Sequence, residues 1–260
     1  MTVYRTPNNK KIYRQASKEF ARLPYPTKNY TFAKNGCGCC AITHCIIERE
    51  RYRKYTPADV RPYMVQFATK GHGTEWRGIT LAMKHYGLKD VKDDLSITEF
   101  FKEMAKGNRV AVFLFNNHKA HVSTGCWTMG GHYVAVVGMK VKNGKHYLYM
   151  KDSGNRKHDG WYAYETTMKG CINKIWVGRL PDEIDLPDKG YWTFGDKSPE
   201  IIKIQKFLKK KGFYNGKIGT KSGKIGRKTF DAIKKWQKAN GLVVDGKWGA
   251  KCNAVYEVQI

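Results

Sequence analysis

The chain has 260 residues, of which 41% are hydrophobic and 27% are charged, and this composition is that of a folded protein rather than a disordered one. Its 48 Lys and Arg residues against 22 Asp and Glu give a formal charge of +26 at pH 7. Such an excess favours a polyanionic partner, which could be a nucleic acid, an acidic membrane surface or an anionic cell-wall polymer. No apolar segment approaches the roughly 20 residues that a membrane span needs. Residues 1–19 also lack the apolar core of a secretory signal, so we expect synthesis in a cytoplasm without a signal peptide.

The first half of the chain is dominated by helix signals. Thr56-Pro57-Ala58-Asp59 combines an N-cap residue, a proline at the first helical position and an acid in the first turn, and the helix is expected to extend to about Ala68, with Pro62 as its weak point. Ser96 and Glu99 have the spacing of a capping box, which predicts a helix that ends near Gly107.

Strand signals follow the helices. The β-rich segments are Arg109–Phe115, Tyr133–Val141, His146–Met150 and Lys174–Gly178. Asn143-Gly144, between the second and third of these, is the dipeptide that a two-residue hairpin turn prefers. Helices first and an antiparallel sheet second predict an α+β domain over residues 1–180.

The chain after this domain divides into a linker and a second domain. Residues 181–194 contain prolines and acids without periodicity, and we interpret them as a linker. Residues 195–260 are basic and helical: helices are expected from Pro199 to about Lys211, from Arg227 to Ala239 and from about Ala250. These predict a small three-helix bundle, which suits binding better than catalysis in a deep cleft.

Four of the seven cysteines lie within nine residues, at 37, 39, 40 and 45. Gly36 and Gly38 flank Cys37 and permit a sharp turn and close approach of a substrate. The residues that follow can form a helix whose N-terminus faces Cys37, where free N–H groups and the helix dipole stabilise a thiolate. Cys37 is therefore a candidate nucleophile.

Two other interpretations of this cluster remain open. Free cysteines are commonly small buried hydrophobes, which suits Cys40 and Cys45 within the helical run. A structural zinc site is disfavoured because Cys-Gly-Cys-Cys is more crowded than the usual ligand spacing and no matching second pair follows.

A histidine and a carboxylate are suitably placed to assist Cys37. His132 follows two glycines at the start of a predicted strand, and Asp152 ends the next one. Pairing of these strands through the Asn143-Gly144 turn is expected to bring the two side chains together, so that the carboxylate orients the imidazole. Individually, His132 is also compatible with a structural strand-end residue and Asp152 with a turn former.

The other histidines form no comparable pattern. His118 and His121 lie in a predicted loop before His132, where they are expected at the surface or along the cleft. The remaining histidines, at 44, 72, 85, 146 and 158, have no matching context, and no H-x-x-x-H pair indicates a metalloprotease. We expect no metal and no cofactor.

Together, these segments resemble the papain-like cysteine peptidases related to the bacteriocin leader (double-glycine) peptidases, over roughly Tyr30 to Val177. The resemblance implies that Cys37 is the nucleophile, His132 the general base and Asp152 the orienting acid. Many relatives have a glutamine about six residues before the nucleophile, where this chain has Thr31. The candidates for stabilising an oxyanion are therefore the Cys37 backbone N–H and the Asn35 side chain.

A second resemblance covers about Phe194 to Tyr256. Here Gly223-Lys224-Ile225-Gly226-Arg227-Lys228 recurs 23 residues later as Gly246-Lys247-Trp248-Gly249-Ala250-Lys251. With Trp236-Gln237 and Val244-Asp245 between the two copies, this pattern resembles the three-helix peptidoglycan-binding domain. Cys252 stands where many relatives have threonine, as Thr229 does in the first copy, and is not expected to be reactive.

A peptidase domain joined to a peptidoglycan-binding domain, without a signal peptide, resembles a bacteriophage endolysin. The combination implies a monomeric cell-wall hydrolase that is made in the host cytoplasm and cleaves an amide bond in the peptide part of peptidoglycan. An N-acetylmuramoyl-L-alanine amidase using the same residues is the first alternative, and a non-catalytic wall-binding or virion protein is the second. A nucleic-acid-binding protein rests on the charge alone, because no readout motif accompanies it, and no specific nucleic-acid partner is expected.

The charge is distributed unevenly between the two predicted domains. Residues 195–260 contain 16 Lys and Arg against five Asp and Glu, which makes them about twice as basic per residue as the rest of the chain. This concentration indicates attraction of the smaller domain to an anionic cell wall.

Overall fold

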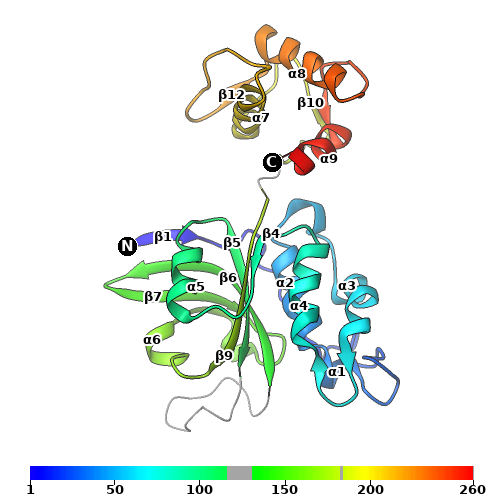
Figure 1. Ribbon diagram of the computed structural model, residues 1–260, viewed down its shortest axis with the longest axis vertical. Coiled ribbons are helices and arrows are strands. Elements are labelled where there is room, and N and C mark those ends of the chain that lie inside the picture. The colour runs from blue at the N-terminus through cyan, green and yellow to red at the C-terminus, as the bar shows by residue number, and fades with distance from the viewer. Residues whose placement is uncertain (116–130, 182–183, 260) are drawn as a thin grey trace. The chain divides into compact units, whose positions relative to one another are not determined.

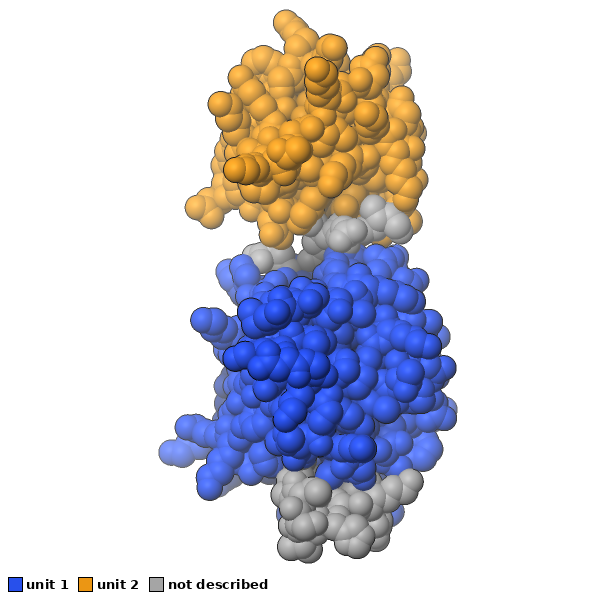
Figure 2. Space-filling model, turned by 90° about the vertical axis from the view of Figure 1, so that its left-hand side faces the viewer, with its two compact units in different colours: residues 1–181 blue, residues 182–260 orange. Residues whose placement is uncertain are grey.

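The computed structural model describes residues 1–115, 131–181 and 184–259, and the chain divides into two compact units. The first unit is Met1–Pro181 and the second is Asp182–Ile260, coloured separately in Figure 2. His118, His121 and Cys126 lie outside the described residues.

An antiparallel sheet is the centre of the first unit, with the strand order β4-β9-β5-β6-β7-β8 and with β1 paired to the far end of β6. The strands are β1 (Thr2–Arg5), β4 (Lys89–Lys92), β5 (Arg109–Phe115), β6 (His132–Lys142), β7 (Lys145–Lys151), β8 (Gly160–Ala163) and β9 (Ile172–Arg179). The four strands expected from the sequence correspond to β5, β6, β7 and β9. The antiparallel α+β architecture expected for this part of the chain is confirmed.

Helices cover both faces of this sheet (Figure 1). They are α1 (Phe32–Asn35), α2 (Cys37–Ile46), α3 (Pro57–Met64), α4 (Trp76–His85), α5 (Ile97–Met104) and α6 (Tyr164–Thr167). The side chains of β5 alternate between the two helical layers. Val110, Val112 and Leu114 pack with the core of α2, α3 and α4. Ala111 and Phe113 pack with α5 on the other face. Successive side chains of a strand point to opposite faces, so a continuous apolar strand is buried between two helical layers.

Local signals set the boundaries of several elements. Capping boxes open α3 at Thr56 and α5 at Ser96. Pro62 is accommodated within α3, which ends at Met64 and continues as a 3-10 turn. Asn143 and Gly144 have φ angles of 50° and 72°, the left-handed values of the tight turn that joins β6 to β7.

The second unit is built from three helices and two short two-stranded sheets in its described part. Its elements are β10 (Tyr191–Trp192), β11 (Lys197–Ser198), α7 (Pro199–Lys210), β12 (Gly223–Lys224), α8 (Arg227–Ala239), β13 (Trp248–Gly249) and α9 (Ala250–Gln259). Strand β10 pairs with β13, and β11 pairs with β12. The core includes Trp236 and Trp248, which stack with ring centroids 4.7 Å apart.

Residues 184–194, which the sequence assigns to a linker, belong structurally to the second unit. Ile184 is buried in its core, and Trp192 lies in β10 and donates a hydrogen bond from Nε1 to the Asp185 carbonyl. A two-residue strand is too short to produce a periodic hydrophobic pattern, so its sequence looks like a linker. The second unit therefore begins about a dozen residues earlier than expected.

None of the described helices combines the length with the apolar character required to cross a bilayer.

Candidate active site

Cys37 is the first residue of α2, directly after the N-cap residue Gly36. The first N–H groups of a helix have no acceptor within it, so the thiol lies next to free donors and the positive end of the helix dipole. Gly38 is required here by close packing, because a Cβ at that position would lie 2.5 Å from Thr74 Oγ1. The glycine lets α2 approach the strand that carries Thr74, β3 (Gly73–Thr74), which pairs with β2 (Ala68–Thr69).

His132 and Asp152 meet as the strand pairing predicted. His132 begins β6 and Asp152 follows β7, and the tight turn between these strands aligns their other ends. His132 Nε2 lies 2.7 Å from Asp152 Oδ1, and the carboxylate is fully buried. Because Nε2 faces the carboxylate, the other ring nitrogen is the one available to the Cys37 thiol, and the two groups are close enough to shift each other's pKa. The structure thus brings Cys37, His132 and Asp152 together.

The surroundings of Cys37 favour a charged pair. Burial raises the pKa of the thiol, but the hydrogen bond and positive charge of His132, together with backbone N–H groups of Tyr133 and Gly38, lower it below its ordinary value. Burial likewise lowers the pKa of His132, yet hydrogen bonds to Asp152 and Cys37 raise it to about 10. Cys37 and His132 therefore stabilise each other's charged forms, a thiolate and an imidazolium.

The other cysteines of α2 have the opposite character. Cys39, Cys40 and Cys45 are fully buried, and burial raises the pKa of each thiol well above its ordinary value. They are core residues, in agreement with the interpretation of Cys40 and Cys45 from the sequence. One helix therefore carries an activated thiol at its tip and inert thiols along its buried body.

A second imidazole holds Asp152, and the sequence did not reveal it. His158 Nδ1 lies 3.0 Å from Asp152 Oδ2, while Oδ1 accepts backbone N–H groups of Gly154 at 2.7 Å and Asn155 at 3.2 Å. Burial raises the pKa of the Asp152 carboxyl, but the hydrogen bonds of His132, His158 and the Gly154 N–H outweigh it and hold this pKa well below its ordinary value. The available signal was the position of His158 only six residues after Asp152, on a loop that can turn back.

Arg14 and Asp159 complete the frame around this loop. Arg14 donates a hydrogen bond to the Asp152 carbonyl and forms an ion pair with Asp159. Asp159 Oδ1 accepts the Asp152 backbone N–H at 3.1 Å. The main chain of the acid is thus fixed from both sides, which preserves the orientation of its carboxylate.

A buried charge cluster anchors the end of β7 behind the site. Lys151, next to Asp152, places Nζ 2.8 Å from Glu48 Oε1, and Arg5 Nη2 lies 2.6 Å from Glu48 Oε2. These side chains are almost wholly shielded from solvent. Since Glu48 lies just beyond α2, the cluster links the helix of the nucleophile to the strands of the histidine and the acid.

Cys37 opens into a cleft of about 400 Å³. Its lining comes from the segment before α2, the β2–β3 turn, α4 and the ends of the sheet strands: Lys34, Asn35, Cys37, Gly71, His72, Gly73, Thr74, Trp76, Leu114, Gly131, Tyr133 and Asn173. Trp76 is 54% exposed, and Lys174 Nζ lies 4.8 Å from its ring centroid. The cleft therefore offers the Cys37 thiol and an exposed aromatic surface on its lining.

Asn35, the proposed oxyanion donor, lies beside Cys37 in this cleft and is nearly buried. Its Nδ2 donates to the Tyr25 carbonyl at 3.2 Å. An amide nitrogen has two N–H bonds, so one remains for another acceptor. His44, by contrast, lies in the core and accepts the Tyr13 backbone N–H at 2.8 Å, a structural role.

Within the described ranges, no group of three or more His, Cys, Asp or Glu side chains is arranged to hold a metal ion.

Comparison with known families identifies part of the second unit. Residues 197–255 match the family model described as "Putative peptidoglycan binding domain". No curated protein matches the chain. The peptidoglycan-binding resemblance found in the sequence is thus supported over most of residues 195–260.

Among solved structures, one named "putative C39-like peptidase from Bacillus anthracis" is 13% identical, with a TM-score of 0.43, and covers 69% of this chain and 98% of its own. Another, a periplasmic domain of the EpsAB fusion protein of the Vibrio vulnificus type II secretion system, is 11% identical, with a TM-score of 0.27, and covers 94% of this chain and 83% of its own. TM-scores this low do not establish a shared fold.

Proposed function

We propose that the protein is a cell-wall hydrolase that cleaves an amide bond in the peptide part of peptidoglycan through Cys37, His132 and Asp152. The observation that carries the proposal is the position of the Cys37 thiol at the tip of α2 next to His132, whose Nε2 lies 2.7 Å from Asp152 Oδ1. The family match over residues 197–255 supports peptidoglycan as the substrate.

The charged pair suggests how the first half of the reaction proceeds. The Cys37 thiolate attacks the amide carbonyl carbon, and a carbon–sulfur bond forms while negative charge moves to the oxygen. The Cys37 backbone N–H and the free N–H of Asn35 are the proposed donors to that oxygen. The His132 imidazolium then gives its proton to the leaving nitrogen, the carbon–nitrogen bond breaks, and a thioester remains on Cys37.

Water completes the cycle. Neutral His132 accepts a proton from water, whose oxygen attacks the thioester carbonyl and releases Cys37 as thiolate. The products are a new amine and a new carboxylate, and the imidazolium is restored. Asp152 holds the ring orientation throughout and stabilises its positive charge, as the acid does in other triads.

The cleft is compatible with a peptide that carries sugar. Its polar lining can hydrogen-bond a peptide backbone, and the exposed Trp76 ring offers a flat face to a sugar or a side chain. A papain-like peptidase of this kind, joined to a wall-binding unit, is the organisation of an endolysin, and we propose that role for the chain. The muramoyl–L-alanine bond is the alternative target for the same residues.

Replacement of the nucleophile tests the proposal. We expect Cys37→Ala to abolish the clearing of purified cell walls and to leave sedimentation of the protein with those walls unchanged. Cys40→Ser, on the same helix but in the core, is the matched control and should retain turnover if it folds. Clearing of walls at the wild-type rate by Cys37→Ala would overturn the mechanism, whereas a folded but unreactive Cys37 in the wild type would favour a non-catalytic wall-binding protein.

A further inference from the structure

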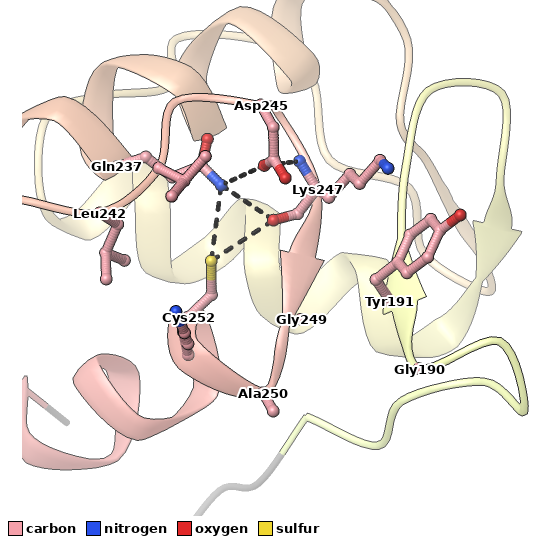
Figure 3. Close-up of a pocket in the computed structure, with 11 residues that line it drawn as sticks. Gly190, Tyr191, Gln237, Leu242, Asp245, Lys247, Gly249, Ala250 and Cys252 are labelled. Carbon is pink, nitrogen blue, oxygen red and sulfur yellow. Dashed lines mark hydrogen bonds between the residues drawn. The ribbon is translucent and has the colours of Figure 1, made fainter.

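The second unit contains a pocket of about 240 Å³. It is lined by β10 with the residue before it, by Gln237 of α8, by the chain from Leu242 into β13, and by the start of α9. Figure 3 shows Tyr191 on one side, Leu242 on the opposite side and the Lys247 side chain extending towards Tyr191. Tyr191 lies outside residues 197–255, so the family match does not include this wall of the pocket.

Internal hydrogen bonds hold the pocket in shape. The buried Gln237 donates from Nε2 to Asp245 Oδ1 at 3.0 Å and to the Lys247 carbonyl at 2.9 Å, and its Oε1 accepts the Gly246 N–H at 2.9 Å. Asp245 Oδ1 also accepts the Lys247 backbone N–H at 2.8 Å. The loop is therefore preorganised, which lowers the entropic cost of binding.

The same network occurs in both copies of the repeat, so its role is structural. In the first copy of the repeat, Gln205 Nε2 donates to the Lys224 carbonyl at 3.0 Å and to Thr229 Oγ1 at 3.0 Å. In the second copy, Gln237 makes the same bonds to the Lys247 carbonyl and, at 3.7 Å, to Cys252 Sγ. Cys252 thus replaces a hydroxyl in a buried contact, which is consistent with the expectation that its thiol has a structural role. The side chains left to meet a ligand are those around the network.

Those side chains combine apolar surface with positive charge. Leu242, Val243 and Ala250 provide aliphatic contacts, and Val243 is 70% exposed. Lys247 and Lys251 also line the pocket, and Lys247 Nζ lies 4.7 Å from the centroid of the Tyr191 ring. The volume is smaller than that of a typical drug-sized site, roughly 300–1,000 Å³, so it suits one or two small residues.

We propose that this pocket binds the stem peptide of peptidoglycan, with an alanine methyl group against the aliphatic residues and a carboxylate next to Lys247. Stem peptides carry methyl side chains and free carboxylates, whereas the glycan strand offers chiefly neutral hydroxyl and N-acetyl groups. Charge complementarity therefore favours the peptide, and the Tyr191 ring covers it from the side of β10. The proposal rests on peptidoglycan as the substrate in the proposed function, and it adds which part of the polymer the second unit holds.

Wall binding by the full chain tests this site, with Cys37→Ala present throughout to prevent cleavage. Tyr191→Ala and Lys247→Gln are each expected to weaken sedimentation with purified walls about tenfold. Tyr191→Phe keeps the ring and should bind within about twofold of the parent. Lys224→Gln removes the same charge at the equivalent position of the first repeat, away from the pocket lining, and should also remain within about twofold.

Competition identifies the ligand class. A soluble stem tetrapeptide is expected to displace the protein from walls, and a chitin oligosaccharide is not. Displacement by the oligosaccharide alone, or binding by folded Tyr191→Ala and Lys247→Gln equal to that of Lys224→Gln, would overturn the proposal. Cleavage is measured separately, with the chain that has native Cys37. If the pocket does not bind the stem peptide, cleavage still occurs. If the proposed chemistry is wrong, binding to walls is still displaced by the stem peptide.

Discussion

The two units of this chain use charge in opposite ways. In the first unit, charged groups near the site are buried and face one another, as His132 faces Asp152 and Lys151 faces Glu48. In the second, most lysines are exposed, and residues 195–260 hold 16 basic against five acidic side chains. Buried pairs fix protonation states and geometry, whereas exposed charge attracts a polyanion over a longer range and is screened by salt. This difference agrees with the proposed catalysis by the first unit and the proposed wall binding by the second.

The largest expected effect comes from removing the base. His132→Ala takes away the positive partner of Cys37 and the proton donor for the leaving amine, so we expect wall hydrolysis to fall by about 10⁴-fold or more. Wall binding should stay at the wild-type level, because the second unit is untouched. The rate of fragment release measures hydrolysis, and the extent of sedimentation of the same preparation measures wall binding. A parallel loss of binding would contradict the assignment of wall binding to the second unit.

The next largest loss of activity is expected from removing the charge of Asp152. Asp152→Asn preserves the shape of the site but removes the charge that orients and stabilises imidazolium, and a loss of roughly 10²- to 10⁴-fold in turnover is expected. His158→Asn should cost less, because Asp152 keeps its bonds to His132, Gly154 and Asn155. Turnover of a soluble stem-peptide substrate measures the two variants side by side. An Asp152→Asn enzyme as active as the wild type would contradict the orienting role.

The pKa shifts set the direction of the pH dependence. Below the lowered pKa of Cys37 the thiol is protonated and both alkylation by iodoacetamide and hydrolysis are lost. As pH rises through about 10, His132 loses its proton, so hydrolysis falls while alkylation of the thiolate continues. In His132→Ala, burial acts on Cys37 without the histidine, and the midpoint of alkylation should move to higher pH. A midpoint unchanged by that replacement would show that the pair does not activate the thiol.

The buried cluster behind the site should affect stability more than wall affinity. Lys151→Met leaves Glu48 with only part of its positive surroundings, and we expect the free energy of unfolding to decrease by about 3 kcal/mol. Denaturant unfolding of the full chain measures it, and Lys145→Met, at the exposed start of the same strand, is the control. Equal stability of the two variants would show that the buried cluster does not stabilise the first unit.

Salt has the mildest effect and acts on the second unit. Raising the ionic strength from about 0.05 M to about 0.5 M shortens the screening length severalfold and should weaken wall binding by roughly tenfold. Hydrolysis of a small soluble peptide, which depends on the buried site, should change little. Salt-insensitive wall binding would count against the electrostatic attraction inferred from the lysines.

The parts of the site that were predictable came from local signals. Asn143-Gly144 requires a tight turn, and that turn aligns His132 with Asp152; Gly36-Cys37-Gly38 before an apolar run marks a helix tip. The support for Asp152 was not predictable, because Arg14 comes from more than a hundred residues away and His158 lies on an irregular loop.

The same distinction explains the misplaced domain boundary. Helices α7 and α8 carry long periodic patterns, and their limits were found almost to the residue. Strand β10 has two residues, and only its pairing with β13 makes it part of the second unit. That pairing depends on residues almost sixty positions later, which no local pattern reports, and it places Tyr191 beside the pocket.

Hydrolysis of defined peptidoglycan in ¹⁸O-labelled water, followed by mass spectrometry of the released fragments, tests the central claim most directly. We predict one new amine and one new carboxylate per cut, with a single ¹⁸O in the carboxylate, from the wild-type chain and not from Cys37→Ala. The position of the new ends also distinguishes a cut within the peptide from one at the muramoyl–L-alanine bond. Fragments with new reducing sugar ends, or labelled products that persist in Cys37→Ala, would contradict it.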